Sequence, residues 1–83
     1  MRMVYFAWVR ERVGVSEEDV SPPASVATIA DLVDWLSGQS TAHAAAFAQR
    51  DRLRAARDQA FVSLDTPIDG AKEIALFPPV TGG

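Results

Sequence analysis

The last seven residues, Phe77-Pro78-Pro79-Val80-Thr81-Gly82-Gly83, form a segment whose reactive group is a backbone carboxylate. Gly82 and Gly83 have no side chains, so the walls of a partner can close directly on the backbone. Such a segment can enter a narrow channel and present only the carboxylate of Gly83. Because a carboxylate is a poor electrophile, it must first become an acyl-adenylate or a similar anhydride. The residues thus predict a carboxylate that is activated and then attacked by a nucleophile.

Two prolines before this terminus predict its direction. Pro78 and Pro79 fix φ near the polyproline value and hold Phe77 extended, so the chain leaves its last strand along a defined path. An extended segment from Pro78 to Gly83 reaches roughly 20 Å. Activation needs ATP and a separate enzyme, because the sequence has neither of the glycine-rich motifs that cradle phosphates. A Gly-Gly end that arose by chance or remains from a linker is the alternative that the residues leave open.

Length and composition limit what else the chain can do. Its 83 residues suffice for one domain, 48% of them are apolar, and the formal net charge of -3 argues against nucleic acid as a partner. The lack of cysteine excludes disulfides, cysteine-ligated zinc and a cysteine nucleophile. The apolar run near the N-terminus is too short for a signal peptide or a membrane span. We therefore expect a soluble, cytoplasmic protein that binds neither nucleic acid nor membrane.

The elements that must position the terminus begin with two strands and a helix. Residues 3–9 are almost continuously apolar, which is typical of a strand covered on both faces. Residues 17–20 predict a short strand that forms a hairpin with the first. Residues 28–36 predict the main helix, with Thr28 as its N-cap. Its apolar face is formed by Ile29, Leu32, Val33 and Leu36.

The second half of the chain mixes helical and strand patterns. Residues 41–59 are rich in Ala, Arg and Gln and predict a helix, with a strand from Leu53 to Arg57 as the alternative. Residues 60–64 and 73–77 predict strands. In the last strand, one face is expected to carry Ile74 and Leu76 and the other Ala75 and Phe77. This order of elements predicts an α+β domain in which one main helix packs on one sheet.

Three stretches of the sequence match a known family. They are residues 4–11 (V-Y-F-A-W-V-R-E) with Val13-Gly14, residues 58–68, and residues 69–83, whose closing F-P-P-V-T-G-G is the most specific part. With these the chain resembles the small subunits of molybdopterin synthase, the MoaD-like sulfur carriers. The resemblance implies a ubiquitin-like β-grasp fold, with a mixed sheet of four to five strands on one main helix. It implies a domain over residues 1–77, an extended flexible tail over 78–83, and a strand from Leu53 to Arg57.

The resemblance also implies a mechanism and its partners. A ubiquitin-activating-type adenylyltransferase uses ATP to adenylate the carboxylate of Gly83, and a sulfur donor system converts it to a thiocarboxylate. The tail then enters the large subunit of a heterotetrameric synthase and donates sulfur to cyclic pyranopterin monophosphate, in molybdenum cofactor biosynthesis. The chain is expected to bind no cofactor or metal and to be non-catalytic on its own. A sulfur carrier for thiazole synthesis and a ubiquitin-like protein modifier are the alternatives.

Several residues match family positions that contact the large subunit or the activating enzyme. Gly82 belongs with Gly83 to the expected reacting terminus. The expected partner-binding residues are Phe77, Phe61, Arg10, Pro78, Pro79, Val80 and Thr81. For the two Phe residues, packing in the core is the alternative, and Arg10 by itself is typical of a solvated strand end. The single histidine, His43, has no companion ligand and is expected to have no function. A basic run comprises Arg50, Arg52, Arg54 and Arg57 and is typical of a solvated face. Docking to an acidic surface is the minor alternative for this run.

Overall fold

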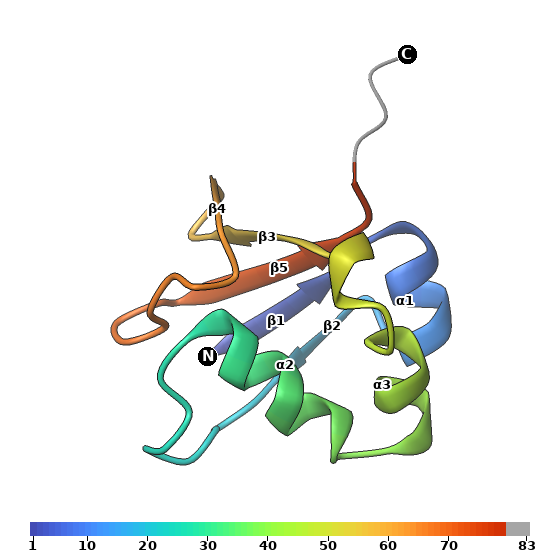
Figure 1. Cartoon of the computed structure of the whole chain (residues 1–83), viewed down its shortest axis with the longest axis horizontal. Helices are drawn as coiled ribbons and strands as arrows, with labels where there is room; N and C mark the ends of the chain where they lie inside the picture. The colour runs from blue at the N-terminus through green and yellow to red at the C-terminus, as the bar shows by residue number, and fades with distance from the viewer. Residues whose placement is uncertain (80–83) are drawn as a thin grey trace.

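A computed structural model of the chain describes residues 1–79 and contains one mixed five-stranded sheet (Figure 1). Along the chain the elements are β1 (Arg2–Tyr5), α1 (Ala7–Val13), β2 (Glu17–Asp19), α2 (Ile29–Ser37), α3 (Thr41–Ala46), the 3-10 helix η1 (Arg50–Arg52), β3 (Arg54–Arg57), β4 (Ala60–Val62) and β5 (Glu73–Phe77). The strand order is β2-β1-β5-β3-β4. The central pair, β1 and β5, is parallel, and the other neighbours are antiparallel. The predicted α+β class with a mixed sheet is confirmed.

The main helix forms as predicted. The Thr28 hydroxyl accepts a hydrogen bond from the backbone N–H of Asp31, and the Asp31 carboxylate accepts one from the N–H of Thr28. This reciprocal pair satisfies two N–H groups that a helix start would otherwise leave unpaired. The buried face of α2 consists of the four predicted residues, Ile29, Leu32, Val33 and Leu36.

The first predicted strand is wrong in its second half. β1 ends at Tyr5, and residues 7–13 form the helix α1. Val9 and Val13, four residues apart, are both buried in the core, so helical spacing satisfies burial where strand propensity failed. Gly14 then ends the helix with φ 98°, a conformation that glycine adopts without strain. β2 pairs antiparallel with β1 as predicted, although a helix rather than a tight turn connects them.

The middle of the chain, residues 41–59, ends in a strand and does not form one long helix. A single helix over residues 41–59 is wrong, because α3 and η1 are both short and β3 follows them. β3 pairs with β5 on one side and β4 on the other, which confirms the strand implied by the family resemblance. Leu53 and Ala55 enter the core, a burial that outweighs the helical propensity of this Ala- and Arg-rich segment.

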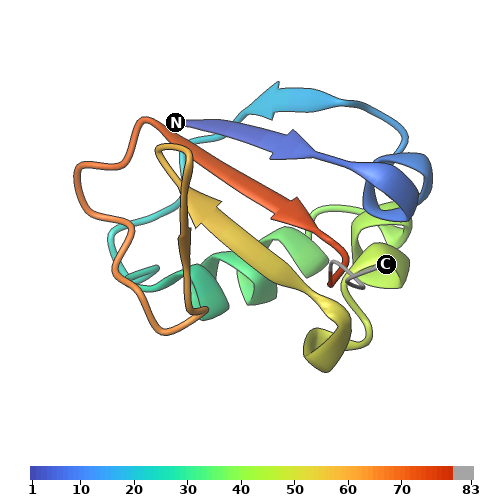
Figure 2. The same ribbon diagram turned by 90° about the horizontal axis from the view of Figure 1, so that it is seen from above.

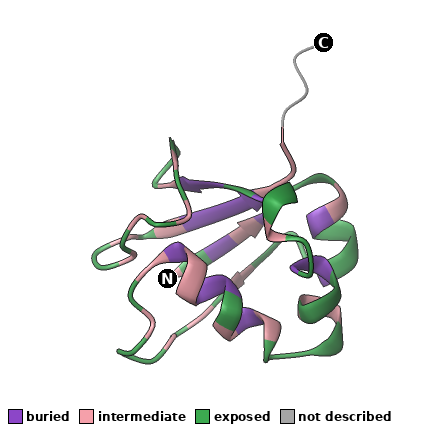
Figure 3. Cartoon of the chain, viewed as in Figure 1, coloured by how far each residue is buried: buried purple, intermediate pink, exposed green. Residues whose placement is uncertain are grey.

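The helices α2 and α3 cover one face of the sheet, and the core lies between these helices and the sheet (Figures 2 and 3). From β5, Ile74 and Leu76 are fully buried in this core, while Ala75 and Phe77 lie on the opposite face, as predicted. Because β1 and β5 are parallel, their carboxyl ends meet at the same end of the domain. α1 therefore begins beside the point where residues 78–79 leave the sheet. We call this the tail end.

Two sequence predictions remain, one on the C-terminal tail and one on membrane spans. The predicted tail spans residues 78–83, of which residues 80–83 lie outside the described part. In residues 1–79, no helix is long and apolar enough to cross a membrane.

Candidate functional site

Phe61 and Phe77 face each other on the side of the sheet opposite the main helix. The strand register places Phe61 opposite Ala56, and Ala56 opposite Ala75, so these three residues form a row across β4, β3 and β5. The rings of Phe61 and Phe77 lie 5.6 Å apart, tilted by 43°. This geometry is typical of favourable aromatic pairs. The side chain of Phe61 is nevertheless 80% exposed, which excludes core packing as its role.

These aromatic residues border an open apolar groove of about 470 Å³, which extends from Pro78 and Pro79 at the tail end to Gln59 and Glu73 at the opposite end of the sheet. Most of its lining is apolar and comes from Phe6, Ala7, Ala56, Phe61, Ala75, Phe77, Pro78 and Pro79, with Gln59 and Glu73 at its polar edge. Phe6 is 49% exposed. A contiguous exposed apolar surface of this kind is typical of a protein–protein interface. One end of the groove lies at the base of the C-terminal segment, because Pro78 and Pro79 are part of its wall.

The structure brings together four of the predicted partner-binding residues: Phe61, Phe77, Pro78 and Pro79. Arg10 is exposed, but it lies on helix α1 and not at a strand end, which corrects the sequence interpretation. Val80, Thr81, Gly82 and Gly83 lie outside the described residues.

Sequence reasoning missed Phe6 and Ala7 as lining residues. The N–H of Phe6 donates to the carbonyl of Leu76 at 3.2 Å, which holds Phe6 beside β5. Ala7 has φ 53°, a left-handed conformation that is unusual for alanine and turns the chain sharply from β1 into α1. Their only sequence signal was the apolar run of residues 3–9, which strand periodicity misassigned.

A second, polar cavity of about 320 Å³ lies between α1 and η1. It is lined by Trp8, Arg12, Gln49 and Arg52, and we call it the basic cleft. The guanidinium of Arg12 lies 4.6 Å from the centre of the Trp8 ring, within the range of a cation–π interaction. Since Trp8 follows Ala7 in α1, the basic cleft and the apolar groove are adjacent along the same helix.

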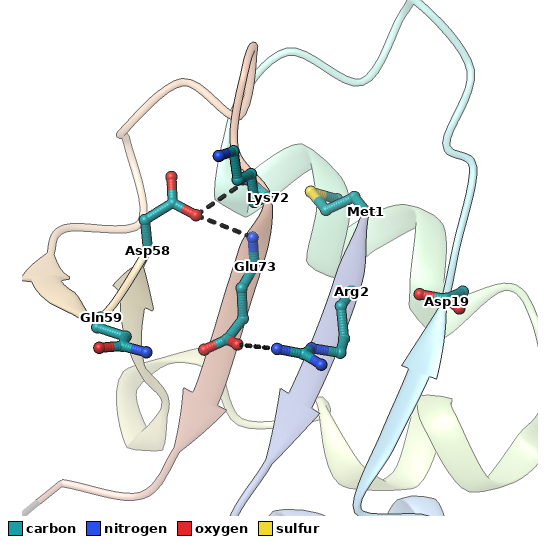
Figure 4. Close-up of a pocket in the computed structure, with 7 residues that line it drawn as sticks. All are labelled: Met1, Arg2, Asp19, Asp58, Gln59, Lys72 and Glu73. Atoms are coloured by element: carbon teal, nitrogen blue, oxygen red, sulfur yellow. Dashed lines mark hydrogen bonds and ion pairs between the residues drawn. The ribbon is translucent and has the colours of Figure 1, made fainter.

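The opposite end of the sheet holds a third pocket, which is charged (Figure 4). There Arg2 pairs with Glu73 at 2.8 Å, and one Asp58 oxygen accepts hydrogen bonds from the N–H groups of Lys72 and Glu73. These side chains already satisfy one another, which makes a structural role the simplest interpretation. In residues 1–79, no three His, Asp or Glu side chains gather into a candidate metal site.

A hydrogen-bonded network joins the core to its edge on the helix-covered face. The Tyr5 hydroxyl donates to Glu18 at 2.7 Å, and His43 Nε2 lies 2.8 Å from the same carboxylate oxygen. His43 Nδ1 lies 2.7 Å from the Ser40 hydroxyl. Burial and the bond to Glu18 raise the pKa of Tyr5. None of these residues lines the apolar groove, and the contacts of His43 join α3 to the edge strand β2.

The fold and this site define a class of protein. A small β-grasp-like domain carries an apolar docking groove at the base of its C-terminal segment, and among the groove-lining residues no nucleophile–base pair is present. Residues 3–83 match the model of the ThiS family, and the chain belongs to this family.

Two individual relatives share the name of one kind of subunit. The chain is 39% identical over 83 residues to the molybdopterin synthase sulfur carrier subunit of Escherichia coli (strain K12), covering 100% of this chain and 99% of that protein. It is 30% identical over 87 residues to the subunit of the same name from Mycosarcoma maydis, covering 100% and 92%. These similarities extend over the whole chain, its C-terminal segment included.

Solved structures confirm the ubiquitin-like fold. SAMP1 from Haloferax volcanii has a TM-score of 0.72 and 30% identity, covering 100% of this chain and 98% of that one. A putative molybdopterin converting factor, subunit 1, from Pyrococcus furiosus has a TM-score of 0.70 and 26% identity, covering 95% of each chain.

Proposed function

We propose that this chain is the sulfur carrier subunit of a molybdopterin synthase. The carboxylate of Gly83 is adenylated, converted to a thiocarboxylate, and donates its sulfur to cyclic pyranopterin monophosphate in molybdenum cofactor biosynthesis. The observation that carries the proposal is the position of the apolar groove at the base of the C-terminal segment. The full-length similarity to sulfur carrier subunits supports it.

The chemistry is divided between this chain and its partners. An adenylyltransferase joins the Gly83 carboxylate to the AMP part of ATP and releases pyrophosphate. Hydrosulfide delivered by a donor system then attacks the acyl carbon, forms a C–S bond and displaces AMP, which leaves the thiocarboxylate. We place these steps in the cytoplasm, where ATP is available to the activating partner.

The groove supplies binding energy at both stages. The large synthase subunit and the activating partner each have to hold the tail inside a channel. A partner that covers Phe61, Phe77 and Phe6 removes their apolar surface from water, which favours association by about 25 cal/mol per Å² before the entropy of binding is subtracted. The domain thereby anchors the tail while the partner supplies the catalytic groups.

Mass spectrometry of the intact protein tests the proposal. Incubation with the activating enzyme, ATP and a sulfur source is expected to add the mass of one oxygen-to-sulfur exchange, located at Gly83. A variant that lacks Gly82 and Gly83 is the control and should remain unchanged. A wild-type protein that never gains this mass would refute the carrier function.

A protein modifier is the second candidate. Similarity to a solved structure favours it, because a chain named H. volcanii small archaeal modifier protein 1 has 30% identity and a TM-score of 0.70. A modifier would form amide adducts with lysines of other proteins, and these adducts would disappear when Gly83 is deleted. Thiocarboxylate formation without such adducts would favour the carrier.

A further inference from the structure

Positive charge gathers at the tail end of a protein whose net charge is negative. Of the eight Lys and Arg residues, five lie in α1, in η1 and at the start of β3: Arg10, Arg12, Arg50, Arg52 and Arg54. The carboxylates of the same segments are Glu11 and Asp51. α1 and η1 flank the point where the chain leaves β5 (Figures 1 and 2). The formal net charge of the whole chain is -3, so the two signs are segregated.

Within this region, the basic cleft is built to accept an anion. Arg12 and Arg52 are exposed, and within residues 1–79 neither forms an ion pair with a carboxylate. By contrast, Arg50 pairs with Asp34 at 2.7 Å and is thus engaged. Stacking on Trp8 restricts the Arg12 side chain and leaves its N–H groups available. Two guanidinium groups and the Gln49 amide can donate several charge-assisted hydrogen bonds to one or two carboxylates.

We propose that the basic cleft binds aspartate and glutamate side chains of the adenylating partner, at the mouth of the channel that receives the tail. This inference rests on the proposed function and extends its interface beyond the apolar groove. Ala7 lines the groove and the next residue, Trp8, lines the basic cleft, so a protein seated on one extends over the other. An apolar centre with a charged rim is the usual anatomy of a transient interface.

The adenylating enzyme has to capture and release a carrier in every cycle. Complementary charges accelerate association without requiring a long-lived complex. Carboxylates beside its channel therefore suit the basic cleft, and the large subunit is the comparison partner in the experiment below.

Stopped-flow association with the purified adenylating enzyme tests the proposal. Arg52→Glu is expected to reduce the association rate constant about tenfold at low ionic strength, with the loss shrinking as salt is added. Lys72→Glu is the matched control, because it makes the same change of charge on an exposed side chain at the opposite end of the sheet. Its rate should stay within about twofold of wild type. Binding of both variants to the large subunit should change little. Equal rates for the two variants, or an equal loss with the large subunit, would overturn the proposal.

A second measurement separates this inference from the carrier function. A peptide of six glutamates is titrated into the protein while the two tryptophan indole N–H signals are followed by NMR. We expect the Trp8 signal to shift in wild type and not in Arg52→Glu, while the Trp35 signal stays in place. A Trp8 signal that does not move refutes the basic cleft even if Gly83 is loaded with sulfur. A shift without any sulfur loading retains the cleft and refutes the carrier function instead.

Discussion

The hydroxyl of Tyr5 donates a 2.7 Å hydrogen bond to the carboxylate of Glu18 and so ties the central strand β1 to the edge strand β2. His43 lies in α3, which packs against α2, and contacts the same carboxylate. Burial by itself would raise the pKa of Glu18, but the hydrogen bonds from His43 and Tyr5 outweigh burial and lower it. The folded protein therefore favours the ionised form of Glu18.

The lowered pKa predicts an acid-dependent loss of stability. The contribution of Glu18 is fully present above its ordinary pKa of 4.5 and is lost as the pH falls through the lower folded-state value. Glu18→Gln should reduce the free energy of unfolding by about 1–2 kcal/mol at pH 7 and by less at pH 3. Urea titrations at several pH values measure this difference. Glu17→Gln, on an exposed neighbour, is the control, and a Glu18→Gln deficit that does not change with pH would contradict the mechanism.

Phe61 is expected to matter for binding and not for stability. Since its side chain is 80% exposed, Phe61→Ala should change the free energy of unfolding by only about 0.5 kcal/mol. Its affinity for the large synthase subunit should fall about 10- to 100-fold, because buried aromatic residues dominate interface energies. Calorimetric titration measures the affinity. Val15→Ala, at a side chain that is 45% exposed outside the groove, should bind normally, and a normal affinity of Phe61→Ala would remove the groove from the interface.

Ala7 provides a test of backbone strain at the groove. Its φ of 53° disfavours a residue with a Cβ atom, so Ala7→Gly should raise the stability by up to about 1 kcal/mol. For a domain of this size that corresponds to a rise in Tm of about 4–8 °C. Differential scanning calorimetry measures it. Ala44→Gly, exposed inside α3, is the control and should lose about 1 kcal/mol instead, as glycine usually does in a helix. A parallel loss in both variants would show that Ala7 is not strained.

The contrast between α2 and α1 shows what the sequence alone could predict. α2 has its cap, its apolar face and its end within one local stretch, so local rules located it. α1 begins with aromatic and β-branched residues that favour strands, and only the burial of Val9 and Val13 against the assembled core makes it helical. β3 was identified through the family resemblance, since its burial depends on distant partners.

The candidate site also combines features that local sequence predicts with features that depend on distant parts of the chain. Phe61 and Phe77 were identified from family positions. Alternation along the last strand placed Phe77 on the face opposite Ile74 and Leu76, but local sequence could not show that Phe61 lies on the same face. That fact follows from the registers of β3 with β4 and β5, which join residues far apart in the chain. The basic cleft depends in the same way on the packing of α1 beside η1. The basic run was expected to be mainly solvated, yet Arg57 donates a 2.7 Å hydrogen bond to the carbonyl of Asp69.

Asp58 offers a last test, at the turn between β3 and β4. Asp58 and Gln59 have φ values of 48° and 73°, the pattern of a tight hairpin turn that favours Asp, Asn and Gly. Its carboxylate also accepts hydrogen bonds of 3.0 Å from the N–H groups of Lys72 and Glu73, which fixes the start of β5. Asp58→Ala removes both contributions and should reduce the free energy of unfolding by about 1–2 kcal/mol, measured by urea denaturation.

Asp58→Asn is the informative comparison, because it keeps an acceptor oxygen and the tolerance for positive φ while removing the charge. We expect it to lose less than about 0.5 kcal/mol. If Asp58→Asn loses as much as Asp58→Ala, the charge of Asp58 and not its geometry stabilises the turn. Asp58→Ala changes none of the residues that line the apolar groove and leaves Gly83 unchanged. Thiocarboxylate formation by this variant should therefore remain close to wild type at temperatures where it is folded.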